Sequence, residues 1–151
     1  HLHSEGKHAL ELSLKGPSTM HWVPEIIEEN PQEDIPYYPY MNGQYVFKNA
    51  VQRFSEVIME GLQENGLEVS DIDMLIPHQA NLRISQFIQQ KFKLNDDQVF
   101  NNIQKYGNTT AASIPIALTE AWEQGKIKEG DHVVLAAFGS GFTWASAVIN
   151  W

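Results

Sequence analysis

The sequence of 151 residues contains no cysteine. This absence excludes disulfides, thiolate metal sites and a cysteine nucleophile supplied by the chain itself. No apolar run approaches the ~20 residues that span a bilayer, and no signal-peptide pattern opens the sequence. Basic residues are also scarce, because 10 Lys and Arg stand against 19 Asp and Glu, for a net charge of −9. We therefore expect no nucleic-acid or membrane partner, and an acidic partner would need a local basic patch.

Hydrophobic residues make up 42% of the chain, which favours one folded domain over disorder. The lack of cysteine suits a cytoplasmic protein. The sequence opens at His1 without a methionine, so we expect it to be part of a longer protein. His1, His3 and His8 are close together but lie at the terminus, and His78 has no carboxylate at ligand spacing. We therefore expect no metal site.

Hydrophobic periodicity predicts strands that alternate with helices. An apolar–polar alternation predicts a half-buried strand, or one arm of a hairpin, over residues 8–15. The other predicted elements are helices over 44–64, over 79–92 and from the end of 107–115 to Gly125, and strands over 71–77, 99–100, 132–138 and 142–150. Residues 16–43, with an acidic run at 25–29 and Tyr37, Tyr38 and Tyr40, are expected to form a connector or functional loop. The order β-αβαβα-ββ predicts an α/β fold with a mixed sheet covered by helices.

His78 follows the strand predicted over 71–77 and precedes the helix predicted over 79–92. Ligands of α/β sheets bind at this carboxyl edge of the strands. A helix N-terminus disfavours the imidazolium, so a neutral ring with one donor and one acceptor is expected. A single histidine at a strand end is more often a structural hydrogen-bonding group than a catalyst, but a second polar cluster favours function.

Asn108 and the turn Gly139-Ser140-Gly141 lie at equivalent positions, where the chain leaves or enters the sheet. Asn108 can be explained as an ordinary helix N-cap. The glycine turn can be explained as a hairpin turn, or as a backbone N–H directed at a developing oxyanion. The residues alone leave these interpretations open.

Three segments carry a family resemblance, namely HQANLRI at 78–84, GNTTAASIP at 107–115 and FGSGFTWAS at 138–146. In this order they resemble the C-terminal half of β-ketoacyl-acyl-carrier-protein synthase III, a thiolase-fold condensing enzyme that starts fatty-acid synthesis. The similarity extends to NGQYVFK at 42–48 and to the opening HLHSEG. The chain is identified as a member of this family.

The resemblance implies a C-terminal domain over residues 1–151, with 1–43 as connector and first strand and 44–151 as core. It implies pairing with a Cys-bearing N-terminal half that is absent here, and a homodimer in the full-length protein. In such enzymes the Cys takes an acyl group from acyl-CoA. Malonyl-acyl carrier protein then loses CO₂, and its carbanion attacks the thioester.

The resemblance also assigns roles to residues. His78 and Asn108 would hydrogen-bond the malonyl thioester carbonyl and stabilise the enolate, a role that suits neutral donors. The N–H groups of the Cys and of Ser140 would hold the acyl-thioester oxyanion. Acyl-CoA and malonyl-acyl carrier protein are substrates, and no cofactor is implied.

Further residues would bind the substrates. The positions implied to line a pantetheine tunnel are Gly43, Phe47, Ala80, Asn81, Ile84 and Phe138. Arg83 at the tunnel mouth, with Lys48 and Lys91, would meet phosphate or the acidic carrier protein. A solvated helix face explains the two lysines as well.

The sequence departs from the family in two respects. Ser140 stands where the family often has Gly, which is a mild change if only the backbone N–H acts. The missing Cys matters more, because the chain alone cannot form an acyl-enzyme and is expected to be inactive. Two alternatives stay open: a related synthase that makes quinolones, alkylresorcinols or esters, for which the Tyr/Pro-rich segment 31–40 would be suited, and a non-catalytic binding module.

Overall fold

The structure is a computed structural model that describes residues 1–14 and 39–151. The acidic run at 25–29, Tyr37 and Tyr38 lie outside the described residues, so the expectation for them stays a prediction. The strands are β1 Leu2–Ser4, β2 Leu12–Ser13, β3 Tyr40–Met41, β4 Met74–Pro77, β5 His132–Gly139 and β6 Thr143–Asn150. The α-helices are α2 Gly43–Glu64, α3 Leu82–Phe92, α4 Ile103–Tyr106 and α5 Ser113–Glu123. The 3₁₀ turns are η1 Gly6–His8, η2 Val69–Asp71, η3 Asp96–Gln98 and η4 Thr110–Ala112.

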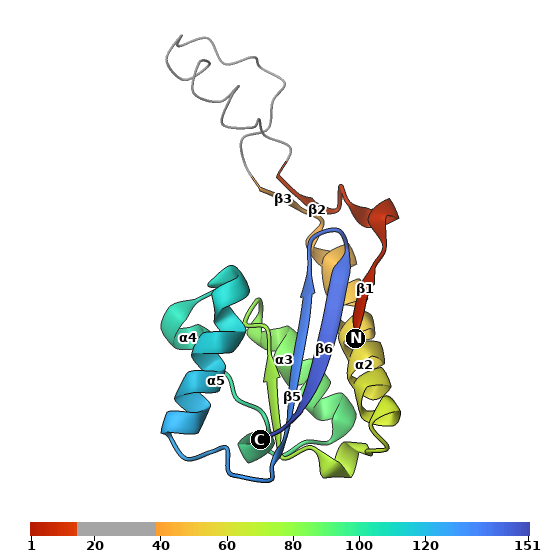
Figure 1. The fold of residues 1–151 in the computed structure, drawn as a ribbon. Coiled ribbons are helices and arrows are strands. Elements are labelled where there is room, and N and C mark those ends of the chain that lie inside the picture. The colour runs from red at the N-terminus through yellow and green to blue at the C-terminus, as the bar shows by residue number, and fades with distance from the viewer. Residues whose placement is uncertain (15–38) are drawn as a thin grey trace, which may run out of the picture.

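The main sheet has the strand order β1-β6-β5-β4. β4 runs parallel to β5, whereas β6 runs antiparallel to β5 and to β1, so the sheet is mixed as predicted. Pro77, the last residue of β4, lies opposite Ala136 near the end of β5. The segment after β4 and the turn after β5 therefore leave the sheet at the same edge (Figure 1).

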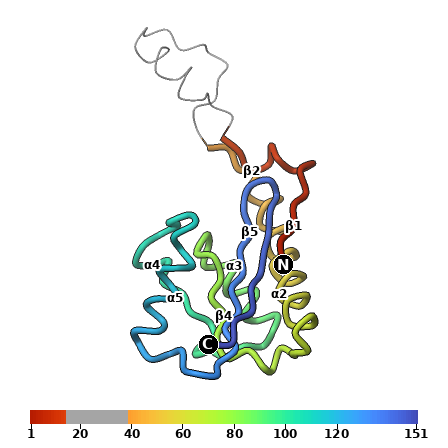
Figure 2. Tube along the Cα trace, viewed as in Figure 1, coloured from red at the N-terminus to blue at the C-terminus, as the bar shows by residue number. Residues whose placement is uncertain are grey.

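Helices cover both faces of the sheet, with α2 and α3 on one face and α5 on the other (Figure 2). Side chains of a strand point alternately to the two faces. Leu75 of β4 and Val134 of β5 pack against α2 and α3, whereas Met74 and Val133 pack against α5. The chain is an α/β domain with this mixed sheet between two helical layers.

The longest helix, α2, confirms the prediction for residues 44–64 almost to the residue. The Asn42 side chain accepts a hydrogen bond from the Tyr45 N–H at its start, and Gly66, with φ of +69°, follows its end. Gly61 allows α2 to lie close to β6. A Cβ at this position would lie 2.9 Å from Ser146 Oγ.

The predicted strand over residues 8–15 is wrong, because His8 ends η1 and, among the described residues 8–14, only Leu12–Ser13 forms a strand. Leu12 and Ser13 pair antiparallel with β3, as expected if this segment were one arm of a hairpin. In the main sheet, the N-terminal strand is instead β1, which pairs with β6. The short strand at 99–100 is only an isolated bridge between Val99 and Leu75. The helix predicted from residue 79 begins at Leu82, because the Gln79 side chain is buried among backbone groups.

Candidate active site

A cavity of about 1100 Å³ opens at the edge of the sheet where β4 and β5 end. Its walls come from the start of α2, the β4–α3 junction, the loop before α5 and the β5–β6 turn. Most of its lining atoms are apolar. Ten of the twelve predicted site residues line it, namely Gly43, Phe47, His78, Ala80, Asn81, Arg83, Ile84, Asn108, Phe138 and Ser140. Lys48 and Lys91 do not.

His78 presents a half-buried imidazole to the cavity. Its backbone N–H donates to the Ala136 carbonyl at 2.8 Å, which fixes the residue beside the end of β5. Burial lowers the pKa of the His78 imidazole below its ordinary value, so the ring is neutral near pH 7. This agrees with the neutral ring expected from the sequence, although the cause is burial rather than a helix N-terminus directly after it.

The buried hydroxyl of Ser113 determines which nitrogen of His78 carries the proton. Ser113 Oγ lies 2.5 Å from His78 Nδ1, and it accepts a hydrogen bond from the Gln79 N–H at 3.3 Å. Among the described residues His78 Nδ1 is the one acceptor within reach of the Ser113 hydroxyl, so we assign the hydroxyl proton to this bond. The neutral ring then carries its own proton on Nε2, where it serves as a hydrogen-bond donor.

Gln79 holds this corner of the site in place and is only 3% exposed. Its Nε2 donates to the carbonyls of Pro77 and Phe100, and its Oε1 accepts from the N–H groups of Asn102 and Ile103. One side chain thus satisfies four backbone groups, of which the Ile103 N–H is part-buried. The β4–α3 junction and the start of α4 are fixed together.

Asn108 lies in the loop between α4 and α5 and is exposed at the cavity. It is not the N-cap of the next helix, as one interpretation held, because Ala112 occupies that position. Its Oδ1 accepts from the Thr110 N–H at 2.8 Å. Within residues 1–14 and 39–151 no group accepts from its Nδ2, which is therefore a free amide donor at the cavity.

Glu120 of α5 anchors the helix that precedes Asn108. Its carboxylate accepts hydrogen bonds from Asn102, Lys105 and Tyr106, of which the bond from the Tyr106 hydroxyl measures 2.6 Å. The bond from Lys105, followed by those from Tyr106 and Asn102, lowers the pKa of Glu120 to about 2. The charged acceptor therefore persists over the usual pH range.

The β5–β6 turn forms the wall that contains Ser140. Gly141 has a φ of +135°, and a Cβ there would meet Thr143 Cγ2 at 2.9 Å, so glycine is required at this position. The Ser140 hydroxyl donates to the Leu12 carbonyl at 2.5 Å. The Ser140 N–H makes no hydrogen bond to any described part of the chain, which leaves this donor available at the cavity.

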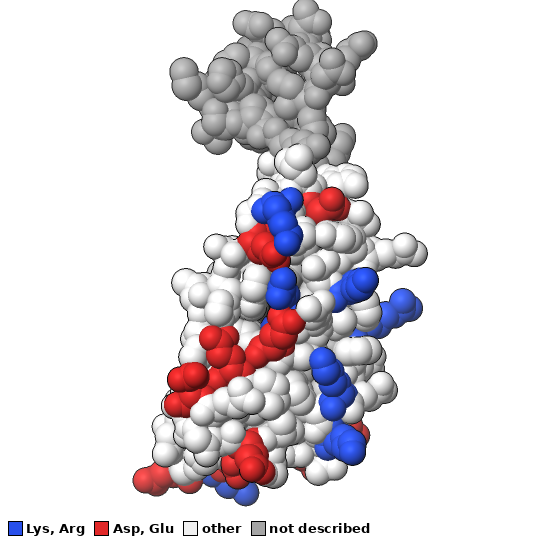
Figure 3. All heavy atoms as spheres, turned by 90° about the vertical axis from the view of Figure 1, so that its right-hand side faces the viewer, with Lys and Arg blue, Asp and Glu red and all other residues white. Residues whose placement is uncertain are grey.

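The three predicted basic residues are separated by the structure. Arg83 lies in the first turn of α3 and lines the cavity, whereas Lys48 and Lys91 lie on exposed helix surface outside it. On the face of the molecule that presents α2, Figure 3 shows basic side chains toward the right and acidic side chains toward the lower left, with the two kinds side by side near the top. The basic side chains on the right form a local basic area on a chain of net charge −9.

Sequence reasoning missed Ser113, because its role depends on a single contact to His78 across 35 positions of sequence. The only available signal was a small polar residue at the start of a predicted helix. In the described parts of the chain, no three or more His, Asp or Glu side chains are grouped so that they could hold a metal ion. Nor does any helix there have the length and apolar character needed to cross a membrane.

Comparisons with known proteins show to which family the chain belongs. The family model described as "3-Oxoacyl-[acyl-carrier-protein (ACP)] synthase III C terminal" matches residues 62–151. A β-ketoacyl-acyl-carrier-protein synthase III from Roseiflexus castenholzii is 47% identical over 129 residues, which is 85% of this chain and 38% of that protein. The protein of the same name from Aliivibrio fischeri is 42% identical over the full 151 residues, or 44% of its own length.

The fold is shared as well. The crystal structure of the synthase III from Thermus thermophilus superposes with a TM-score of 0.85 at 39% identity, and covers 100% of this chain and 44% of that one. The chain thus spans about two fifths of the length of these relatives. On this agreement of motifs, fold and family model, the chain belongs to the family of 3-oxoacyl-acyl-carrier-protein synthase III C-terminal domains.

Proposed function

We propose that this chain supplies the decarboxylation half of the active site of a condensing enzyme. The enzyme joins an acyl group from acyl-CoA to malonyl-acyl carrier protein and thereby initiates fatty-acid synthesis. The observation that carries the proposal is the presence of two neutral donors, His78 Nε2–H and Asn108 Nδ2–H, at one largely apolar cavity.

The chemistry follows from these donors. When a malonyl thioester loses CO₂, the electron pair of the broken C–C bond moves onto the thioester carbonyl, whose oxygen becomes negative. Neutral donors placed at this oxygen stabilise the enolate, and an apolar cavity strengthens the interaction. The enolate carbon then attacks the acyl-cysteine carbonyl, forms a new C–C bond and releases the cysteine thiolate.

The turn at Ser140 serves the other half of the reaction. Its free N–H would bind the oxyanion that forms when the acyl group is transferred to or from the cysteine. Only the backbone donor is needed, so the Ser140 side chain is compatible with this role. His78 and Asn108 therefore belong to the decarboxylation step, and Ser140 belongs to the acyl-transfer step.

The remaining predicted residues would bind the substrate arm. Gly43, Phe47, Ala80, Asn81, Ile84 and Phe138 provide the wall along which pantetheine would lie. Arg83 at the cavity, with Lys48 and Lys91 outside it, would attract the phosphate and the acidic carrier protein.

The cysteine nucleophile must come from elsewhere, because the chain has none. We propose that residues 1–151 act as the C-terminal domain of a cytoplasmic, homodimeric protein, with residues 44–151 as its core, and that an N-terminal half supplies the cysteine. The chain alone is then inactive in condensation.

The test uses the full-length protein with acyl-CoA and malonyl-acyl carrier protein. The proposal predicts one β-ketoacyl-carrier product and one CO₂ per turnover. An enzyme that accepts a β-ketoacyl acceptor in preference to malonyl-acyl carrier protein would instead be a related secondary-metabolite synthase. A protein that takes up no acyl group would be a binding module.

A further inference from the structure

Glu5 lies where β1 ends, directly opposite the turn that carries Ser140. Its N–H donates to the Phe142 carbonyl at 2.8 Å, and the Phe142 N–H donates to the Glu5 carbonyl at 3.1 Å. This exchange extends the pairing of β1 with β6 by one residue beyond Ser4 and Thr143. The N-terminal segment is therefore hydrogen-bonded to the backbone of Phe142, the last residue of the turn.

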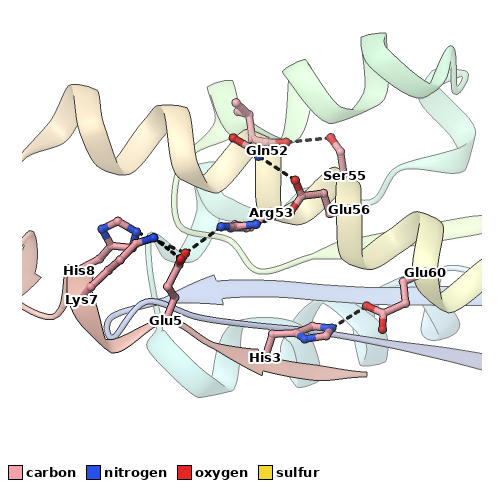
Figure 4. Close-up of polar contacts among 10 residues, drawn as sticks. His3, Glu5, Lys7, His8, Gln52, Arg53, Ser55, Glu56 and Glu60 are labelled. Atoms are coloured by element: carbon pink, nitrogen blue, oxygen red, sulfur yellow. Dashed lines mark hydrogen bonds and ion pairs between the residues drawn. The ribbon is translucent and has the colours of Figure 1, made fainter.

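The Glu5 carboxylate is held by three basic side chains from two elements (Figure 4). Its Oε2 accepts from Arg53 Nη2 of α2 at 2.7 Å and lies 3.3 Å from His8 Nε2 of η1. Its Oε1 is paired with Lys7 Nζ at 2.5 Å. The hydrogen bonds from Lys7 and Arg53 lower the pKa of Glu5 to about 2, so the carboxylate is ionised at any pH used in an assay.

Two of these basic side chains also contact the aromatic rings beneath the turn. The Arg53 guanidinium lies 4.6 Å from the centre of the Trp144 ring. The His8 ring stacks on Phe142 at 5.0 Å, and its Nδ1 is 3.0 Å from the Tyr45 hydroxyl. Phe142 is only 1% exposed, so the turn is anchored through a side chain that the cluster covers.

The rest of the turn has little packing of its own. Ser140 is exposed, and Gly141 has no side chain. Its other attachments are the bond from the Ser140 hydroxyl to Leu12 and the bond from the Thr143 hydroxyl to the Ser140 carbonyl at 3.0 Å. β5 and β6 flank the turn and pair up to Gly139 and Thr143, and the Phe142 ring also packs against the Phe138 ring at 4.9 Å. Beyond these contacts, the N-terminal segment that contains Glu5 holds the turn at Phe142 and, through the Leu12 carbonyl, at Ser140.

We propose that Glu5, Arg53 and His8 form a positioning cluster that holds the β5–β6 turn so that the Ser140 N–H meets the oxyanion of the acyl thioester. The inference rests on the proposed function, which places Ser140 in acyl transfer. The three residues touch no substrate and act through the turn. Their loss therefore slows acyl transfer and leaves decarboxylation, which uses the opposite wall, unaffected.

The size of the effect follows from the oxyanion donor. Removal of one such donor costs roughly 10²–10³-fold in rate, and a displaced donor costs only part of this. We expect Glu5→Gln, which keeps the shape but loses the charge and one acceptor, to slow acyl-enzyme formation about tenfold. Arg53→Met, which keeps the apolar cover of Trp144, should slow the same step by a smaller factor.

Glu60→Gln is the matched control. Glu60 lies on α2, and its carboxylate is paired with His3 Nε2 at 2.6 Å (Figure 4). It is also paired with His1 Nδ1 at 3.1 Å. It makes no contact with the turn. Glu60→Gln removes the charge of a partly exposed carboxylate like that of Glu5. The rates of acyl-enzyme formation and of decarboxylation should therefore stay within about twofold of the wild-type rates.

The experiment uses the full-length protein and four variants, namely Glu5→Gln, Glu5→Asp, Arg53→Met and the control Glu60→Gln. Acyl-enzyme formation from acyl-CoA is followed by intact mass in a single turnover, and decarboxylation is followed by CO₂ release from malonyl-acyl carrier protein. A loss confined to acylation in Glu5→Gln and Arg53→Met, with Glu5→Asp partly restoring the rate, supports the positioning role. Equal losses in both steps, or no loss in either, overturn it. If the wild type itself formed no acyl-enzyme, the proposed function would be overturned. This result concerns the wild type, so it can be told apart from the two variant results that would overturn the positioning role.

Discussion

The two walls of the site are stabilised in different ways. The part of the first wall that carries His78 rests on buried neutral hydrogen bonds, from Ser113 at 1% exposure and Gln79 at 3%. The wall of Ser140 rests on a backbone exchange and on the charged Glu5 cluster, whose Glu5 and Arg53 side chains are each 24% exposed. Buried hydrogen bonds leave an unsatisfied group when one partner is removed, whereas partly exposed charges are resolvated by water and screened by salt.

This contrast links stability to function. Around His78, the decarboxylation wall should tolerate high salt but fail when a buried partner is lost. The acyl-transfer wall should weaken gradually when its charges are removed or screened. Changes to each wall should therefore affect separate steps of one reaction.

The largest effect is expected when the donors of the first wall are removed. His78→Ala and Asn108→Ala in the full-length protein should each lower CO₂ release from malonyl-acyl carrier protein by roughly 10²-fold or more, because each deletes a donor to the enolate oxygen. Acylation of the partner cysteine should be largely unchanged. A comparable fall in acylation would contradict the assignment of the two walls.

A smaller loss is expected from the residue that orients His78. Ser113→Ala should lower decarboxylation about tenfold, because Nδ1 loses its donor and the ring is free to exchange tautomers. Histidine ¹⁵N chemical shifts measure the tautomer directly. Ser85→Ala is the matched control, since Ser85 is also buried but its hydroxyl has no hydrogen-bond partner in the described structure. If Ser85→Ala and Ser113→Ala behaved alike, the tautomer argument would be wrong.

Charge reversal at the cavity mouth should act on binding alone. Arg83→Glu is expected to raise KM for malonyl-acyl carrier protein by roughly tenfold, with little change in kcat at saturation, because like charges oppose docking. The effect should shrink as salt is added. Lys128→Glu, a reversal on the exposed segment that leads into β5, should leave KM unchanged. An unaltered KM for Arg83→Glu would remove Arg83 from the docking area.

The smallest effect concerns pH. Because burial lowers the pKa of His78, the decarboxylation rate should stay constant as the pH falls through about 6.5, the ordinary histidine value, and should decline only below it. Because the pKa of His78 is lower in the folded state than in the unfolded state, the unfolded state takes up this proton first as the pH falls. His78 therefore lowers the free energy of unfolding as the pH falls below about 6.5. A decarboxylation rate that halves at about pH 6.5 would show that the pKa of His78 is not lowered.

The sequence predicted those features that repeat locally or that match a family motif. The hydrophobic periodicity located the 22-residue helix α2, and the three motifs together with the segment 42–48 contain the ten predicted residues that line one cavity. Their roles stay predictions. The start of α3 was misplaced because Gln79, polar and next to a histidine, gave no sign that it would be buried.

The features that the sequence did not show depend on long-range pairing. β1 has three residues and no pattern of its own, and it is a strand only because it pairs with β6 at Leu2 and Ala145. Glu5 contacts Arg53 across 48 positions of sequence, and Ser113 reaches His78 across 35. No local propensity encodes such contacts, so both positioning roles emerged only from the folded structure.

The most direct test is the intact mass of the full-length His78→Ala protein, measured after acyl-CoA and again after malonyl-acyl carrier protein. The account predicts a species more than twice the 17.1 kDa of this chain that gains one acyl group and retains it, because acyl transfer proceeds and decarboxylation does not. A variant that takes up no acyl group, or that loses it as fast as the wild type does, would contradict the division of the site into two walls.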